Sequence, residues 1–379
     1  MFGECAKDVM LGGNSLSSAV SEYYGMPAED FIAICLFVYA AAIGDAAFFT
    51  RRSIEGTEIL RVRRYFESGA WARAFEHLSL DRKSYQERQK AYHEPNPLFA
   101  KYELNVLRKR PVIELAHDVW TVPVINHLGF RATDGIYYDL LDANSGERGN
   151  RFAEAFGLLF ERYVGLLLVE QFGQDAVFPE PAYGKSELRG PDWVVVSDDI
   201  VLAVECRSSR VRLQTRVAGE LSAVRTDLRR ILIDTIRRFP RKVSDLRSGR
   251  TPILIPPNVA IRTMVVSMDE LEPLPLLQAL AVEEVGGEFS PLLISIADFE
   301  YLLPLGGRVG LAGMLERRAE PEQLAMPWDQ FFTREEAMAG LSRDQVRNGL
   351  LARAHDSLWD KLREGYPIPA DAPAPIIDA

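Results

Sequence analysis

The sequence predicts an α/β protein in which a mixed-sheet core lies between a helical N-terminal domain and a helical C-terminal extension. Two patterns carry this prediction. Apolar residues recur at helical spacing over most of residues 1–140, whereas short runs rich in β-branched residues, bounded by turn residues, begin after residue 176. At roughly 100–200 residues per domain, a chain of 379 residues holds two or three domains. We expect the domains at 1–142, 143–308 and 309–379, with a loosely ordered Pro/Ala-rich tail.

The N-terminal region is expected to be mostly helical. Helical spacing is clearest in residues 59–66 and 71–78. Residues 112–128 also indicate one or two helices, interrupted at Pro123.

One segment of this region raises the question of a membrane helix. Residues 31–49 carry one charge, Asp45, and approach the roughly 20 apolar residues that a spanning helix needs. Pro27 and the acids that follow it are typical of a helix start in a globular protein, and Asp45 would be costly in lipid. We favour a buried helix here over a membrane anchor.

The central region changes from helical to extended periodicity. A polar, glycine-bearing loop at 142–150 precedes an amphipathic helix expected at 151–172. A long basic helix is expected at 217–246, with a kink at Pro240. The expected strands are 177–178, 193–196, 200–204, 259–268 and 291–297, and a short helix is expected to begin at 298.

The two strands at 193–204 form a predicted hairpin. If Asp198 and Asp199 make the turn, Ser197 pairs with Ile200, and this register places Asp192 directly opposite Glu205. Opposed Cβ atoms lie about 4.5–5.5 Å apart, where two like charges are unfavourable without a cation between them.

A divalent cation would satisfy this carboxylate pair, and Mg²⁺ prefers such oxygen ligands together with water and substrate phosphate. Arg207 is expected on the same face as Glu205, whereas Cys206 is expected on the opposite face as a buried thiol. Two solvated acids on a surface hairpin are the alternative interpretation.

This arrangement resembles the PD-(D/E)XK superfamily, which has the restriction-endonuclease-like fold. Pro191 and Asp192 match the first half of the motif, and Glu205 begins the second half. The resemblance covers roughly residues 145–305. It implies a helix before the hairpin that carries a glutamate, for which Glu161 stands in the matching place and Glu154 is the fallback.

The activity implied by the resemblance is metal-dependent phosphodiester hydrolysis with Mg²⁺ or Mn²⁺. Asp192, Glu205 and Glu161 would hold the metal, and Asp192, Glu205 and Arg207 would form the catalytic set. The implied substrate is DNA, with RNA as an alternative, and the implied setting is bacterial defence against phage or plasmids.

The sequence departs from the family motif at Arg207, which replaces the motif lysine. Arginine keeps the positive charge but is planar and effectively never deprotonated. Lys185 is a candidate for a substitute amine, and Arg238 stands near the place where many relatives carry glutamine. The alternative is therefore a catalytically inactive protein that keeps the fold to bind nucleic acid or to scaffold a larger complex.

Positive charge is concentrated directly after the hairpin. Residues 207–250 hold thirteen Lys or Arg against four acids, although the whole chain has a formal net charge of -10. Such a segment beside a metal site favours phosphate contacts, and a solvated helix whose arginines pair with acids elsewhere is the alternative. The residues we expect to bind nucleic acid are Arg210, Arg212, Arg216, Arg225 and Arg229.

The sequence lacks the motifs of several protein classes. Three scattered cysteines give no zinc spacing and are typical of a reducing cytoplasm. No phosphate-binding loop of the Walker type and no nucleophile elbow is present. An ATPase or targeting function would therefore come from a protein partner, and an oligomer is compatible with the sequence.

Overall fold

The structure of the protein is a computed structural model. It describes residues 6–11, 13–44, 48–50, 69–91, 105–117, 119–146, 149–184, 187–210, 226, 229–268, 291–324 and 326–365.

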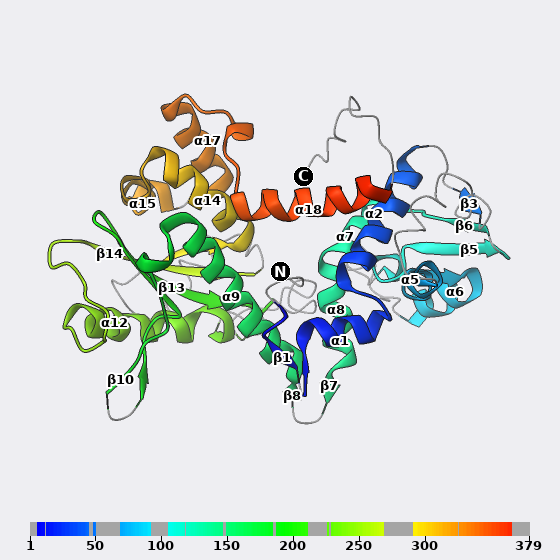
Figure 1. Cartoon of the computed structure of the whole chain (residues 1–379), viewed down its shortest axis with the longest axis horizontal. Coiled ribbons are helices and arrows are strands. Elements are labelled where there is room, and N and C mark those ends of the chain that lie inside the picture. Colours follow the sequence, from blue (N-terminus) through cyan, green and yellow to red (C-terminus); the bar gives the residue numbers. More distant parts are fainter. Residues whose placement is uncertain are drawn as a thin grey trace. The chain divides into compact units, whose positions relative to one another are not determined.

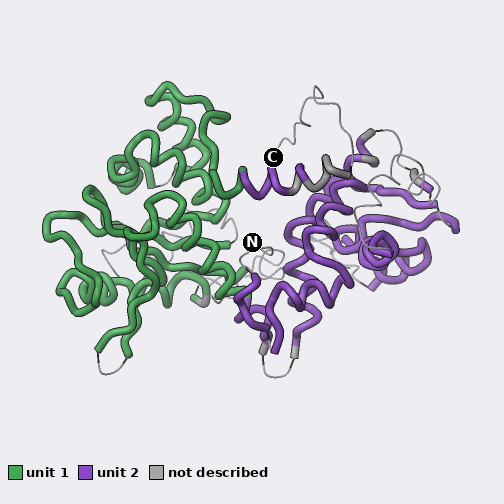
Figure 2. Tube along the Cα trace, viewed as in Figure 1, with its two compact units in different colours: residues 1, 156–352 green, residues 2–155, 353–379 purple. Residues whose placement is uncertain are grey.

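The chain divides into two compact units (Figure 2). Unit 1 comprises Phe156–Ala352 with residue 1, and unit 2 comprises Phe2–Ala155 with Arg353–Ala379. Residues 309–352, which the sequence suggested as part of a separate extension, cluster with the central sheet in unit 1. The boundary between the units falls inside one long helix rather than in the polar loop at 142–150.

Unit 1 is built around a five-stranded mixed sheet with the order β15-β14-β13-β12-β9 (Figure 1). β13 is parallel to β14, and β14 is parallel to β15, whereas β12 is antiparallel to both β13 and β9. This confirms the predicted mixed α/β class. The strands are β9 (Val177–Pro179), β12 (Trp193–Val196), β13 (Val201–Arg207), β14 (Ile261–Ser267) and β15 (Leu292–Ser295), and a separate two-stranded ribbon holds β10 (Ala182–Tyr183) and β11 (Leu188–Arg189).

The hairpin register predicted from the turn residues is confirmed. Trp193 pairs with Val204 and Val196 pairs with Val201. The backbone N–H of Ser197 donates to the carbonyl of Ile200 at 3.0 Å, which closes the turn. One further step of the same register places Asp192 opposite Glu205.

Two helices cover opposite faces of this sheet. α9 (Arg151–Phe172), whose bounds agree with the prediction, packs against the face that carries Trp193, and the short helix η4 (Gln174–Ala176) connects it to β9. Gly165 allows this close approach, since a Cβ atom there would overlap the Trp193 ring. The other face carries Val194, Val201 and Ala203 and packs against α12 (Asp234–Arg247).

The expected basic helix at 217–246 is described only in its second half. A single π-helical stretch, η5 (Arg229–Ile233), leads into α12, which contains Pro240. Residues 217–225 lie outside the described residues. Ile236, Phe239 and Leu246 attach α12 to the sheet, so the orientation of the helix about its axis is fixed by apolar burial.

The C-terminal part is helical, as predicted, and its helices follow directly after β15. These elements are α14 (Ile296–Val309), α15 (Leu311–Arg318), α16 (Pro321–Leu324), α17 (Trp328–Ala339), η6 (Arg343–Gln345) and α18 (Gly349–Gly365).

Residues 342–362 do not form one continuous helix, because the chain is interrupted between η6 and α18. Ser342 and Gln345 form a capping box at the start of the short helix η6, and Val346, which ends it, is extended. A new helix, α18, then begins. Its N-terminus is capped by Asn348, whose Oδ1 accepts from the N–H of Leu350 at 3.1 Å. The tail after residue 365 lies outside the described residues.

Unit 2 contains a sheet that the sequence analysis missed. Its four strands are, in spatial order, β3 (Phe48–Thr50), β6 (Val119–Thr121), β5 (Val112–Ala116) and β4 (Ser79–Asp81). The expected helix over 112–128 is wrong in its first part, where β5 and β6 form an antiparallel pair and a helix begins only at Asn126. Val112, Ile113, Val119 and Trp120 favour a strand once a neighbouring strand is available.

The elements of unit 2 are β1 (Met10–Leu11), β2 (Asn14–Ser15), α1 (Leu16–Tyr24), α2 (Ala28–Gly44), β3 (Phe48–Thr50), α5 (Ala70–Leu78), β4 (Ser79–Asp81), α6 (Arg82–Ala91), η3 (Val106–Arg108), β5 (Val112–Ala116), β6 (Val119–Thr121), α7 (Asn126–Ala132), α8 (Asp134–Ala143), β7 (Ser145–Gly146) and β8 (Gly149–Asn150).

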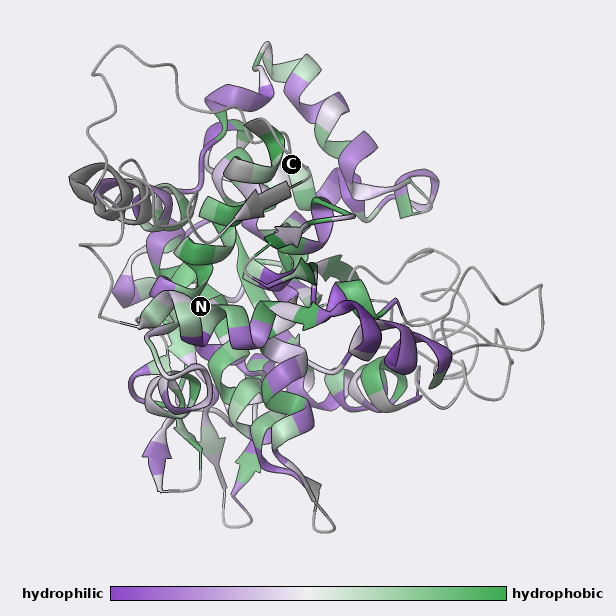
Figure 3. Ribbon diagram, turned by 90° about the vertical axis from the view of Figure 1, so that its right-hand side faces the viewer, coloured by the Kyte–Doolittle hydropathy of each residue, from purple (hydrophilic) through white to green (hydrophobic). Residues whose placement is uncertain are grey.

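α2 occupies most of the apolar segment that raised the membrane question. Its residues Phe31, Ile34 and Cys35 are fully buried, which confirms the expected buried helix. Hydrophobic and hydrophilic residues alternate along many of the helices (Figure 3). Among the described residues, no helix has the length and apolarity required to cross a membrane.

Candidate active site

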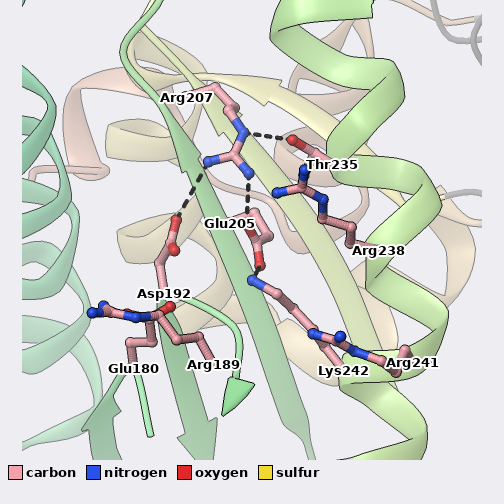
Figure 4. A pocket seen from close by; sticks show the side chains of 9 residues that line it. All are labelled: Glu180, Arg189, Asp192, Glu205, Arg207, Thr235, Arg238, Arg241 and Lys242. Atoms are coloured by element: carbon pink, nitrogen blue, oxygen red, sulfur yellow. Dashed lines mark hydrogen bonds and ion pairs between the residues drawn. The ribbon is translucent and has the colours of Figure 1, made fainter. Parts of the chain in front are cut away.

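The predicted carboxylate pair lies in a pocket of about 260 Å³ in unit 1 (Figure 4). One side of the pocket is formed by the hairpin β12–β13 and the segment around β11, and the other side by α12. The lining residues are Glu180, Arg189, Asp192, Glu205, Arg207, Thr235, Arg238, Arg241 and Lys242.

Glu205 lies at the bottom of this pocket, and its side chain is 2% exposed. Both carboxylate oxygens contact a cation. Arg207 Nη2 donates to Oε2 at 2.8 Å, and Lys242 Nζ donates to Oε1. Burial and the neighbouring Asp192 raise the pKa of Glu205, whereas Lys242 and Arg207 act in the opposite direction. A buried carboxylate requires such compensation, because desolvation of an unpaired charge is strongly unfavourable.

Asp192 faces Glu205 from the start of β12 and is less buried, with 15% of its side chain exposed. Its Oδ2 accepts the backbone N–H of Cys206 at 2.7 Å and lies 3.9 Å from Arg207 Nη1. Burial raises the pKa of Asp192, and the Cys206 hydrogen bond together with Arg207 and Lys242 lowers it. The hydrogen bond from the Cys206 backbone fixes the Asp192 carboxylate at the open end of the hairpin.

Arg207 is held by three hydrogen bonds in addition to its contact with Asp192. Its Nε donates to Thr235 Oγ1 at 2.5 Å, Nη1 donates to the Cys206 carbonyl at 2.8 Å, and Nη2 donates to Glu205. The planar guanidinium therefore bridges the hairpin and α12 (Figure 4). The Cys206 side chain is buried, as predicted, and burial raises the pKa of its thiol.

Lys242 is the functional candidate that the sequence analysis missed. It comes from α12, 37 residues after Glu205, and its side chain is largely buried. The sequence contained a signal for this residue, because Lys242 stands between Phe239 and Leu246 on the apolar stripe of the helix. A lysine on such a stripe needs a buried partner. The alternative amine, Lys185, lies outside the described residues.

Glu161 projects from α9 and does not line the pocket. Burial, followed by the charge of Asp192, raises its pKa to about 7 from an ordinary value of 4.5. The fallback residue Glu154 is exposed on the same helix. Among the described residues, no three His, Cys, Asp or Glu side chains come close enough together to hold a metal ion.

The raised pKa of Glu161 predicts a pH-dependent cost to stability. The folded protein binds this proton more tightly than the unfolded chain, so stability falls as the pH rises from 4.5 to about 7. We expect Glu161→Gln to raise the free energy of unfolding by about 1–2 kcal/mol above pH 7, allowing for solvent screening. Thermal unfolding near pH 4.5 should show no difference, and an equal gain at both pH values would contradict this explanation.

The basic residues predicted from the sequence are only partly described. Arg210 and Arg229 are described, but neither lines the pocket. Arg212, Arg216 and Arg225 lie outside the described residues. The arginines that do line the pocket are Arg189, Arg207, Arg238 and Arg241.

The fold and the pocket together define a mixed α/β protein with an ion-paired carboxylate site at the end of a β-hairpin. No family model matches the sequence, and no curated protein matches it either.

Proposed function

We propose that this protein is a metal-dependent nuclease with a restriction-endonuclease-like core, which hydrolyses phosphodiester bonds of DNA. One observation carries the proposal: Asp192 and Glu205 face each other across a hairpin, and Lys242 and Arg207 lie on the Glu205 carboxylate. Two acids and an amine are the groups that the PD-(D/E)XK motif brings together.

The element order supports the same proposal. A long helix, α9, precedes the hairpin, and a helix, α12, and a parallel strand, β14, follow it. This is the order that the resemblance to the superfamily implies. The implied setting in phage or plasmid defence, with a partner that supplies ATPase or targeting function, belongs to the proposal as well.

Asp192 and Glu205 are chemically suited to hold Mg²⁺ or Mn²⁺, which proteins often bind through one or two carboxylates plus substrate phosphate. A metal on Glu205 would share this carboxylate with Arg207 and Lys242, since both oxygens already contact a cation. When bound, the ion would supply an activated water and stabilise the leaving oxygen.

The cations of the chain have separate tasks in this proposal. Arg207 is fixed by Thr235 and the Cys206 carbonyl, so its guanidinium is preorganised to stabilise negative charge on the phosphate. Lys242 brings an amine to the same carboxylate, where Nζ can orient a water molecule beside the two acids. Lys242 thus supplies the amine that is lost because Arg207 replaces the motif lysine.

A second function is favoured by the same ion pairs. Because Arg207 and Lys242 occupy both oxygens of Glu205, the site is also compatible with a protein that binds nucleic acid without cleaving it. Positive side chains then serve phosphate binding alone.

Cleavage of supercoiled and linear DNA with Mg²⁺ or Mn²⁺, compared with the same reaction in EDTA, tests the proposal. We expect metal-dependent nicking that falls at least about 10²-fold in Asp192→Asn, since the asparagine side chain would keep an acceptor for the Cys206 N–H but not the charge. Cleavage that persists in the variant would show that the site lies elsewhere. Binding without cleavage in either protein would favour the second function.

A further inference from the structure

Two arginines of the pocket, Arg238 and Arg241, are not used by the ion pairs described above. Both are exposed on α12, and no carboxylate among the described residues lies within ion-pair distance of either. The neighbouring Arg237 differs, because its Nη1 lies 3.7 Å from Asp234 Oδ1 and it does not line the pocket.

The orientation of α12 explains why these two arginines face the pocket. Ile236 and Phe239 hold one face of the helix against the sheet. Side chains three or four residues apart share a side of a helix, and Thr235, Arg238 and Lys242 follow this spacing. Arg238 and Arg241 accordingly lie on the same side of the pocket as Thr235 and Lys242 (Figure 4).

The net positive charge of the pocket favours binding of an anion that carries more than one charged group. Its lining holds three carboxylates and five Lys or Arg, an excess of two positive charges in a chain whose formal net charge is -10. Arg207 and Lys242 are directed at Glu205, so the excess resides in Arg238 and Arg241. Like charges placed one turn apart on a helix repel one another, and a bound polyanion removes that repulsion.

We propose that Arg238 and Arg241 form a binding site for a second phosphate of the same substrate strand, next to the phosphate at Asp192 and Glu205. The substrate class is then an oligonucleotide strand and not a mononucleotide or a small phosphodiester. Guanidinium groups are suited to this task because they bind phosphate oxygens bidentately. The assignment rests on the proposed nuclease function for the first phosphate, but its binding test does not depend on cleavage.

Binding is measured with a fluorescently labelled single-stranded deoxyoligonucleotide in EDTA, over a series of salt concentrations. The double variant R238Q/R241Q should bind at least about tenfold more weakly than the wild type. Its plot of log affinity against log salt should be shallower by about 0.7, the value for one phosphate that is no longer neutralised on a single strand. The matched control R237Q should reproduce the wild-type affinity and slope.

A second readout compares substrates for the same three proteins. Cleavage of the oligonucleotide should fall at least about tenfold more than hydrolysis of bis(p-nitrophenyl) phosphate, which offers only one phosphate. Equal losses on both substrates, or an R237Q variant as impaired as the double variant, would overturn the assignment. If the wild type hydrolyses neither substrate yet R238Q/R241Q still loses binding, the nuclease proposal fails while the phosphate site stands. Unchanged thermal unfolding of the double variant checks that it is folded.

Discussion

Replacing Lys242 with methionine should lower metal-dependent DNA cleavage about 10²–10³-fold, the range found when one positioned charge-stabilising donor is removed. Methionine keeps a long apolar stem that can pack between Phe239 and Leu246. What it removes is the amine on Glu205 Oε1, and among the described side chains Arg207 then remains the only cation on that carboxylate. The expected loss of cleavage therefore reflects the missing amine and not a cavity in the core.

The measurement is the single-turnover rate of DNA cleavage at saturating metal. Arg247→Met is the matched control, since Arg247 is exposed in the last turn of α12 and does not line the pocket. Lys242→Arg should keep DNA binding but not cleavage, because the bulkier, planar guanidinium cannot take the place of a compact ammonium group on Glu205 Oε1. Wild-type rates in Lys242→Met would remove this residue from the mechanism.

Replacing Asp139 with alanine should cost about 3–5 kcal/mol of stability in unit 2, because it leaves a buried charge without its partner. Asp139 Oδ2 lies 2.6 Å from Arg131 Nη2, and the two side chains are 3% and 1% exposed. Tyr24 donates its hydroxyl to the same oxygen at 2.9 Å. Burial raises the pKa of Tyr24, so the phenol remains a donor and cannot replace the lost charge.

Hydrogen exchange separates this effect from changes in unit 1. We expect the amides of α1, α7 and α8 to lose protection in Asp139→Ala, whereas those of β13 and β14 keep it, because each unit has its own core. Asp142→Ala is the control, since the Lys109–Asp142 pair is 2.7 Å long but has side chains 45% and 65% exposed. That change should stay below about 1 kcal/mol. Equal losses in the two variants would show that burial does not set the strength of these pairs.

The parts of the fold that depend on neighbouring residues were predictable from the sequence. The Asp198–Asp199 turn fixed the hairpin register and with it the placement of Asp192 opposite Glu205. Apolar spacing over 22 residues gave the bounds of α9. Both signals are local, since a turn and a helical repeat are set by adjacent residues.

The sequence was insufficient to predict secondary structure where pairing with distant segments decides between helix and strand. Residues 112–121 were expected to be helical, but they form β5 and β6 because strands from elsewhere in unit 2 pair with them. β-propensity depends on such neighbours more than helix propensity does. A short apolar run therefore does not by itself distinguish the two structures.

The sequence by itself determined the acidic half of the site, because one hairpin carries both Asp192 and Glu205. Only the tertiary structure decided the basic half. It packs the apolar face of α12 onto the carboxylate face of the sheet, and this brings Lys242 onto Glu205 and Arg238 and Arg241 to the pocket. The physical reason is that a hairpin is set by its turn, whereas the orientation of a helix on a sheet follows from the burial of its apolar side chains.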